Sequence, residues 1–218
     1  MYQVNWKFKP FLFILDFIGY LFFFWKKWFK YPEKPQDILV IRLDHIGDMI
    51  LTSSFFRNLK HSYPEARIHV LCRPLTKPVA ECISYIDEIH ELNVPWFTRG
   101  GSGSWIRTMK WAFSNKFDLV FELHTDPRNI LLSSVVGKYV VGYNVRGFGF
   151  LLNKIIPWSS GIVHIVDRYL DILRFFQLNL DDVKLELNLQ PKIYTEIKKK
   201  LPFATFPKEI VLIHPITG

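Results

Sequence analysis

The chain has 218 residues, of which 49% are hydrophobic, so it can bury a sizeable core in one large domain or in one domain and part of another. Its formal net charge of +8 fits an anionic partner, but no nucleic-acid-binding motif is present, which argues against nucleic acid. The two cysteines, Cys72 and Cys82, have neither zinc-binding nor redox spacing, and so few thiols suggest a reducing compartment.

The first thirty residues are unusually aromatic. The run from Phe11 to Trp25 is apolar except for Asp16, so it is too short and too interrupted for a typical transmembrane helix. It also lacks the small-residue cleavage site of a signal peptide. On a helix, aromatic and aliphatic side chains gather on one face, while polar ones such as Asp16, Lys27 and Lys30 gather near another.

This pattern is typical of a helix that lies in a membrane interface, because tryptophans and lysines flank the apolar run. We therefore expect residues 6–30 to bind a membrane surface, with the aromatic side toward the lipid and the lysines toward lipid phosphates. Two alternatives are an extra helix packed on the protein's own core and a spanning helix. Pro32 and Pro35 separate this segment from the domain that follows.

Beyond this segment, short apolar runs alternate with amphipathic stretches. The expected strands are Ile38–Leu43, Ile68–Cys72, Glu88–Leu92, Phe117–Leu123, Lys138–Tyr143 and Ile210–His214. The expected helices are Met49–Ser62, Pro78–Tyr85, Ser104–Asn115, Pro127–Val136, Gly161–Gln177 and Pro191–Leu201. Strands rich in Val and Ile that take turns with helices predict an α/β fold, with a Rossmann-like, mostly parallel sheet covered on both faces.

The end of the first expected strand is crowded with charge. Arg42, Asp44, His45 and Asp48 follow the apolar run, and ligands of such sheets bind at the carboxyl ends of the strands. A dinucleotide fingerprint, a phosphate-binding loop and a nucleophile elbow each need a glycine pattern that this stretch lacks. What remains is a carboxylate at the start of a helix.

Asp48 is the candidate general base. A carboxylate in the first turn of a helix is stabilised in its charged form by the helix dipole, and a base must be charged before it accepts a proton. Gly47 beside it would let a substrate hydroxyl approach the backbone closely. The alternative is structural, because acidic residues favour first turns and Asp44 could simply cap the helix.

Polar residues also follow another strand. Glu122, His124 and Asp126 alternate there, so their side chains are expected to share one face. We interpret them as a polar wall of the same cleft, because a metal site would need a fourth ligand that is not apparent. The other histidines considered, His61, His69, His90 and His164, show no pattern that predicts a role.

The domain opens with "ILVIRLDHIGDMILTSSFFRNLKHSYPEARIHVLCRP" and continues with "FDLVFELHTDPRNILLSSVVGKYVVGYNVRGFGFLL" and "HIVDRYLDILRFFQLN". These stretches resemble glycosyltransferase family 9, the lipopolysaccharide heptosyltransferases and their relatives. The resemblance covers residues 37–218, and its first stretch is the most specific. It implies a GT-B enzyme, in which two Rossmann-like domains face each other across a cleft. Such enzymes move a sugar, typically heptose from ADP-heptose, onto a lipid-linked acceptor with inversion, and they need no metal or other cofactor.

The resemblance also implies roles for single residues. Asp48 falls on the catalytic base, and Arg42, Asp44, His45 and Gly47 would line the acceptor site beside it. The other residues expected in the acceptor site are Arg73, Asp126, Arg128 and Arg146. Arginine suits anionic acceptor groups because its planar fork donates two hydrogen bonds at once, although a surface ion pair is the alternative for each arginine.

The chain ends in "IVLIHPITG", which resembles the first strand and loop of the family's nucleotide-binding domain. Thr217 and Gly218 would then contact the nucleotide-sugar donor. The expected division is a membrane-interface segment at 1–35, an acceptor-binding domain at 36–207 and the start of a second domain at 208–218. Because most of that second domain is missing from the chain, we expect the chain alone to transfer no sugar.

The sequence thus predicts an inverting glycosyltransferase that binds peripherally to the cytoplasmic face of the inner membrane. Its acceptor would be an anionic glycolipid of the lipopolysaccharide core or a related compound. The alternative is a catalytically silent, membrane-associated domain that binds glycolipid or another protein. Sugar transfer by a full-length version, and binding of acceptor analogues near Asp48, would separate the two hypotheses.

Overall fold

The computed structural model describes residues 7, 9–97, 103–158, 161, 163–178, 180, 183–189 and 191–200. The chain divides into two compact units, Met1–Asn188 and Leu189–Gly218. The first unit contains the sheet, and the second contains helix α8 (Pro191–Lys200). The predicted strand Ile210–His214 lies outside the described residues. The predicted division at residues 35 and 207 stays a prediction.

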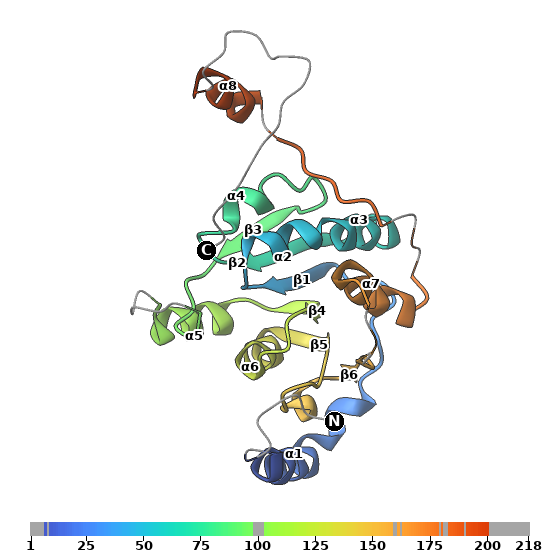
Figure 1. The fold of residues 1–218 in the computed structure, drawn as a ribbon. Coiled ribbons are helices and arrows are strands. Elements are labelled where there is room, and N and C mark those ends of the chain that lie inside the picture. Colours follow the sequence, from blue (N-terminus) through green and yellow to red (C-terminus); the bar gives the residue numbers. More distant parts are fainter. Residues whose placement is uncertain are drawn as a thin grey trace. The chain divides into compact units, whose positions relative to one another are not determined.

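A six-stranded parallel sheet forms the centre of the first unit (Figure 1). Its strands are β1 (Asp37–Arg42), β2 (Arg67–Cys72), β3 (Glu88–Glu91), β4 (Phe117–Glu122), β5 (Gly137–Gly142) and β6 (Lys154–Ile155). Their spatial order is β3-β2-β1-β4-β5-β6, and each neighbouring pair runs parallel. The chain therefore winds outward from β1 to one edge, returns to β4 and winds to the other edge. This doubly wound order confirms the predicted Rossmann-like fold.

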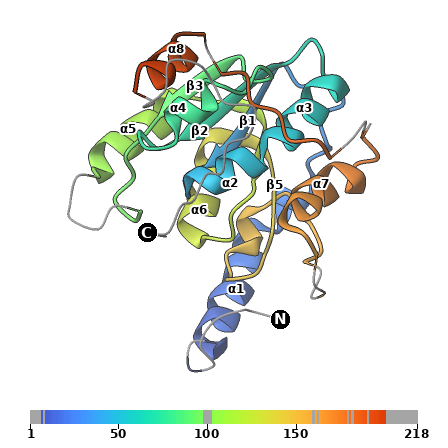
Figure 2. The ribbon, with the colours of Figure 1, turned by 45° about the horizontal axis from the view of Figure 1, so that its top comes forward.

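Helices cover both faces of the sheet (Figures 1 and 2). The α-helices are α1 (Lys9–Phe23), α2 (Ile46–Leu51), α3 (Ser53–Ser62), α4 (Lys77–Ala80), α5 (Trp105–Ser114), α6 (Pro127–Val136) and α7 (Ile165–Phe175). The described part of this unit also contains the 3-10 helices η2 (Phe24–Trp28) and η3 (Gly149–Leu151). Alternation along β1 separates two cores: Ile38 and Val40 pack in the core of α3 and α7, whereas Leu39 and Ile41 pack in that of α5 and α6.

The predicted first helix is wrong in its start and in its continuity. It begins at Ile46 rather than Met49, and it is interrupted at Thr52 between α2 and α3. The Thr52 hydroxyl donates to the Asp48 carbonyl over 2.6 Å, and the Thr52 amide is shared between the carbonyls of Asp48 and Met49. Such local side-chain bonds compete with the regular helix pattern and account for the break.

Two other predicted helices are shorter than expected. α4 ends at Ala80 because the amides of Cys82 and Ile83, just beyond its C-cap Glu81, bond to carbonyls three residues back and form tighter turns. α7 begins at Ile165 because His164 caps it, with its Nδ1 accepting from the Val166 amide over 3.3 Å. The strand β6 was not predicted, because a strand of two residues is too short to show the alternation of apolar and polar residues that marks a strand in the sequence.

The amino-terminal helix α1 is fastened to the rest of the unit by its polar face. Asp16 is only 2% exposed, and its Oδ1 accepts a hydrogen bond of 2.8 Å from the amide of Phe148. Phe148 has a left-handed backbone with φ of 67°, which side chains rarely adopt, so this bond holds a strained turn. Gly19 lies directly against the buried ring of Phe150.

The lysines after α1 also turn toward the protein. Lys26 Nζ donates to the Leu151 carbonyl over 3.2 Å, and Lys27 Nζ donates to the carbonyls of Gly149 and Leu152. These carbonyls belong to η3 and to Leu152, the residue that directly follows it. Lys26 and Lys27 therefore differ from the expectation that they face lipid phosphates. Within the described residues, no helix is both long and apolar enough to span a bilayer.

We predict that Gly19→Ala destabilises the protein. Alanine normally stabilises a helix by about 0.5–1 kcal/mol relative to glycine, but a Cβ here would overlap the Phe150 ring. Overpacking costs about 1–3 kcal/mol, so the melting temperature should fall by several degrees in a thermal unfolding experiment. Gly47→Ala is the matched control, since nothing lies within 4 Å of its Cβ position. A Gly19→Ala protein that melts as high as wild type would show that α1 is not docked in this way.

Candidate functional site

The predicted site lies where the winding of the sheet reverses, at the carboxyl ends of the adjacent strands β1 and β4. Crevices at such switch points are the usual ligand sites of doubly wound sheets. A pocket of about 170 Å³ opens there. It is lined by Arg42, Asp44, His45, Asp48, Leu123, His124, Thr125, Trp158, Ile165, Arg168 and Tyr169.

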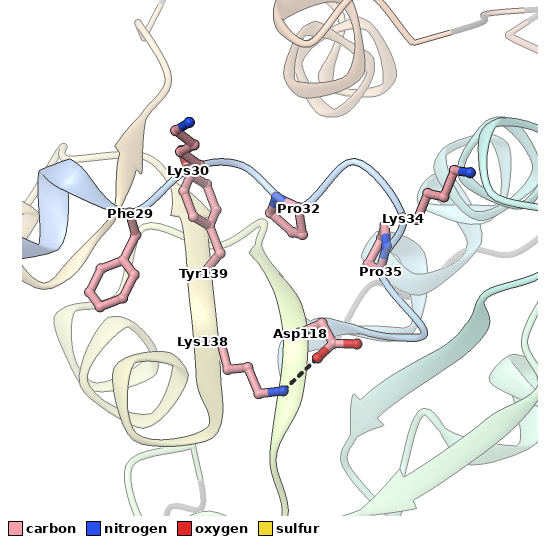
Figure 3. Close-up of a pocket in the computed structure, with 8 residues that line it drawn as sticks. All are labelled: Phe29, Lys30, Pro32, Lys34, Pro35, Asp118, Lys138 and Tyr139. Carbon is pink, nitrogen blue, oxygen red and sulfur yellow. Dashed lines mark hydrogen bonds and ion pairs between the residues drawn. The ribbon is translucent and has the colours of Figure 1, made fainter.

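A larger hollow, of about 330 Å³, lies at the opposite ends of the strands (Figure 3). Its walls include Asp118 and Lys138, which form an ion pair of 2.8 Å, and three residues of the segment after η2, Lys30, Pro32 and Lys34. The one carboxylate among its described lining residues, Asp118, is already engaged by Lys138 and by the backbone amides of Gln36 and Asp37. The smaller pocket is the better candidate for chemistry because it places a carboxylate beside a fully buried cation.

Arg42 is the centre of that pocket. It is the last residue of β1 and is 1% exposed. Its Nη1 lies 3.3 Å from Asp44 Oδ2, and its Nη2 lies 3.4 Å from Asp48 Oδ1 and donates to the Tyr169 hydroxyl. The guanidinium also lies 4.3 Å from the centre of the Tyr169 ring. Removing a partner from such a buried charge costs about 3–5 kcal/mol, so these contacts hold β1, α2 and α7 together.

Asp48 presents its carboxylate to the pocket. Oδ1 also accepts from the Tyr169 hydroxyl over 3.4 Å, and Oδ2 accepts from the His45 amide over 3.4 Å. The His45 ring is close as well, with Nδ1 3.6 Å from Oδ2. The Asp48 side chain is 31% exposed, whereas that of Asp44 is 5% exposed. Asp48 is thus the carboxylate that a ligand can reach.

The structural alternative for Asp44 is wrong, because His45 and not Asp44 is the N-cap of α2. Asp44 instead pairs with Arg42 inside the protein. Burial raises the pKa of Asp44, and the charges of Arg42 and Asp48 act on it in opposite directions. Burial also disfavours the charged form of His124, which lines the same pocket, and for a histidine this lowers the pKa. His124 therefore favours the neutral form.

Glu122, His124 and Asp126 do not form one wall. Glu122 is fully buried, which raises its pKa well above the usual range, and Oε1 accepts from the His124 amide (3.1 Å) and Asn129 Nδ2 (3.2 Å). Asp126 caps α6 by accepting from the Arg128 amide over 2.9 Å. His124 is the one of the three that lines the pocket.

Apart from Arg42, the predicted acceptor-site arginines do not line the pocket around Asp48. Arg128 forms an ion pair of 2.6 Å with Asp126, as the surface alternative anticipated. Arg73 follows β2 and lies 5.9 Å from the ring centre of Phe97. Arg146 is exposed, and none of the three lines the pocket around Asp48 within the described part of the chain. Their assignment to the acceptor stays a prediction, as does that of Thr217 and Gly218, which lie outside the described residues.

Sequence reasoning missed the contribution of α7. Tyr169 and Arg168 line the pocket from this helix, and Trp158 from the loop before it packs its ring 3.9 Å from the Arg168 guanidinium. Burial raises the pKa of the Tyr169 hydroxyl to about 12, so it remains a neutral donor at neutral pH. The only sign of this contribution in the sequence was an Arg-Tyr pair inside a strongly amphipathic helix. Amphipathicity indicates that one face of the helix is buried, but it does not show which residues that face contacts.

The sequence matches no protein-family model and no curated protein. Several solved structures share its fold. A glycosyltransferase family 9 protein from Veillonella parvula has a TM-score of 0.65 and 22% identity, and the match covers 78% of this chain and 49% of that one. The E. coli ADP-heptose LPS heptosyltransferase II has a TM-score of 0.62 and 18% identity, and the match covers 76% of this chain and 50% of that one.

The third structure is an E. coli heptosyltransferase solved with ADP-2-deoxy-2-fluoro heptose. Its TM-score is 0.53 and its identity 10%, and the match covers 68% of this chain and 51% of that one. The chain therefore spans about half the length of the solved proteins that it matches. The resemblance inferred from the sequence is confirmed at the level of the fold: the chain has the fold of glycosyltransferase family 9 proteins, over about half of their length.

Proposed function

We propose that this chain is the acceptor-binding half of an inverting glycosyltransferase, with Asp48 as the general base. The observation that carries the proposal is the position of Asp48 at the switch point, open to a pocket and held by Arg42 and Tyr169. The fold shared with heptosyltransferases supports it. The fixed carboxylate meets the geometric need of a base, which must lie within hydrogen-bond reach of the proton it takes.

In this mechanism an acceptor hydroxyl enters the pocket and gives its proton to the Asp48 carboxylate. Its oxygen attacks the anomeric carbon of the donor sugar from the face opposite the nucleotide. The new oxygen–carbon bond forms as the bond to the diphosphate breaks, so the configuration inverts and the nucleotide diphosphate leaves. Arg42 and the Tyr169 hydroxyl hold Oδ1, which restricts the carboxylate to one orientation and makes its approach to the hydroxyl productive.

We further propose that the donor is ADP-heptose and that the acceptor is an anionic glycolipid of the lipopolysaccharide core. The names of two structural neighbours, both heptosyltransferases, support this choice. Arg168 supports it from this chain, because its guanidinium lines the pocket and suits a phosphate or carboxylate on the acceptor. The donor would be held by Thr217, Gly218 and a second domain.

We also propose that α1 and η2 bind the cytoplasmic face of the inner membrane peripherally. With Asp16 and Gly19 turned inward, the outer side of α1, η2 and the residue after them presents exposed apolar side chains. These are Phe11, Phe13, Ile14, Phe17, Ile18, Leu21, Phe22, Phe24, Trp25, Trp28 and Phe29. So large an apolar surface with aromatic residues is typical of a membrane-binding helix.

The role of Asp48 is tested by Asp48→Asn in a full-length version of the enzyme. The amide keeps the shape of the side chain but cannot accept the proton, so we expect kcat to fall at least about a hundredfold while acceptor binding persists. Asp171→Asn, on the exposed side of α7, is the matched control and should leave kcat unchanged. Transfer by Asp48→Asn within a few fold of wild type would favour the silent binding domain instead.

Tyr169→Phe tests whether the hydroxyl orients the base. It removes the group that donates to Asp48 Oδ1 and leaves the ring beside Arg42. A hydrogen bond to a charged group contributes about 1.5–3 kcal/mol at ideal geometry. This bond is long, at 3.4 Å, so kcat should fall roughly 3- to 10-fold with little change in the acceptor KM. Tyr31→Phe removes a hydroxyl contact with Tyr63 elsewhere in the fold and serves as the control. Equal kcat values for both variants would rule out this positioning role.

The membrane proposal is tested by the double variant Phe17→Ser and Phe22→Ser. Both rings are exposed, at 58% and 72%, so the change should leave the melting temperature as it is. Binding to anionic vesicles, measured by co-sedimentation, should weaken about tenfold or more because apolar burial in the interface is lost. Ile106→Ser, at an 81% exposed position of α5, is the control. Undiminished sedimentation of the double variant would mean that α1 does not anchor the protein.

A further inference from the structure

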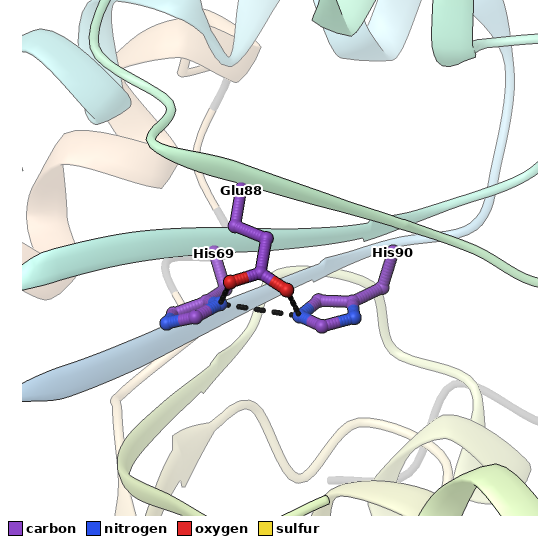
Figure 4. A group of neighbouring side chains, drawn as sticks. All are labelled: His69, Glu88 and His90. Atoms are coloured by element: carbon purple, nitrogen blue, oxygen red, sulfur yellow. Dashed lines mark hydrogen bonds and ion pairs between the residues drawn. The ribbon is translucent and has the colours of Figure 1, made fainter.

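Three side chains with metal-binding atoms meet on strands β2 and β3, away from Asp48 (Figure 4). The strand register places His69 of β2 directly beside Glu88 of β3. His90 is two residues further along β3, so its side chain projects from the same face as that of Glu88. His69 and Glu88 lie in the amino-terminal halves of their strands, whereas Asp48 follows the carboxyl end of β1.

The ligand atoms of the three side chains, one from each residue, lie within 4.8 Å of one another. His69 Nδ1 and His90 Nε2 are 3.1 Å apart. The two oxygens of Glu88 complete the set, with Oε2 3.4 Å from His69 Nδ1 and Oε1 3.6 Å from His90 Nε2. An ion about 2.0–2.1 Å from each of its tetrahedral ligands sets ligand-to-ligand distances of about 3.3 Å. The three side chains can therefore converge on one ion with little movement.

A second carboxylate orients the buried histidine. Asp37 Oδ1 lies 3.0 Å from His69 Nε2 and is itself held by Arg67 at 2.7 Å. If Nε2 donates to this carboxylate, the lone pair of His69 is on Nδ1 and points at His90 and Glu88. A carboxylate behind a coordinating imidazole is the usual outer partner of a bound metal, which fixes the tautomer and raises the basicity of the ligand.

We propose that His69, Glu88 and His90 form a binding site for a divalent cation of the zinc class that ties the edge strand β3 to β2. Two imidazoles and one carboxylate suit Zn²⁺ and its neighbours, whereas Ca²⁺ and Mg²⁺ prefer sets made of oxygen alone. Glu88 is 53% exposed, so ions can enter from solvent and water can complete the coordination. Phe117 and Trp111 close the inner side, with ring centres 5.7 and 5.5 Å from that of His90.

The role of this ion is structural. β3 has four residues and, among the strands that the structure describes, it pairs with β2 alone, so its backbone bonds hold it weakly. A metal shared between β2 and β3 would lock their register. The site is independent of the proposed sugar transfer, and it explains why two histidines and a carboxylate gather on strands where apolar residues would suffice.

Zinc titration of the chelator-treated chain tests the site, by calorimetry and by competition with a fluorescent chelator. We expect one Zn²⁺ to bind per chain, to raise the melting temperature and to slow amide exchange in β3. His90→Ala and Glu88→Gln should each weaken zinc binding at least tenfold. Asp37→Asn removes no ligand but should weaken binding about 10- to 100-fold through the orientation of His69.

His61→Ala is the matched control, since this exposed histidine of α3 lies outside the cluster and should leave zinc affinity unchanged. The proposal is overturned if wild-type protein binds no zinc, or if Glu88→Gln binds it as well as wild type does. The second outcome would place the ion elsewhere in the chain. Glu88→Gln alters an exposed side chain, so it decides the question even where His90→Ala does not fold.

Discussion

The buried guanidinium of Arg42 is the constraint on which the carboxyl end of the sheet depends. A cation at the last position of a central strand must be neutralised where water cannot reach it. Asp44 and Asp48 do so from the loop and helix that follow β1, and Tyr169 adds its hydroxyl and ring from a position 127 residues later in the sequence. The same contacts therefore fix the start of α2, the placement of α7 and the walls of the pocket between them.

Asp44 and Asp48 share the guanidinium of Arg42, but they differ in how far they are buried. Asp44 is buried, and burial raises its pKa in spite of the favourable charge of Arg42. Asp48 makes the same kind of contact but stands at the mouth of the pocket, with about a third of its side chain open. Unequal environments around paired acidic groups are a common way in which active sites separate a reactive group from a supporting one. The environment of Asp48, more than its place in a helix, recommends it as the base.

The features that depend on local sequence patterns could be predicted from the sequence. Apolar runs located β1, β2 and β4, and the charges after β1 located the pocket. Contacts between distant segments were beyond it: the amphipathic period of α7 predicts that Tyr169 is buried, but not that its hydroxyl lies 3.4 Å from Asp48, 121 positions away. His69 and His90 meet only once the register of β2 and β3 is known. Lys26 and Lys27 were misplaced because their acceptors lie in η3, more than a hundred residues away.

The docking of α1 connects the proposed membrane surface to the proposed site. Asp16 bonds to the turn after β5, and Lys26 bonds to the end of η3 in the same connection. β5 pairs with β4, and the residues after β4 carry His124 into the pocket. A helix held by hydrogen bonds at these points cannot turn its apolar face independently of the sheet. If that face binds lipid, the pocket is presented to the bilayer in one orientation, which suits an acceptor whose reactive hydroxyl stays attached to a membrane-embedded lipid.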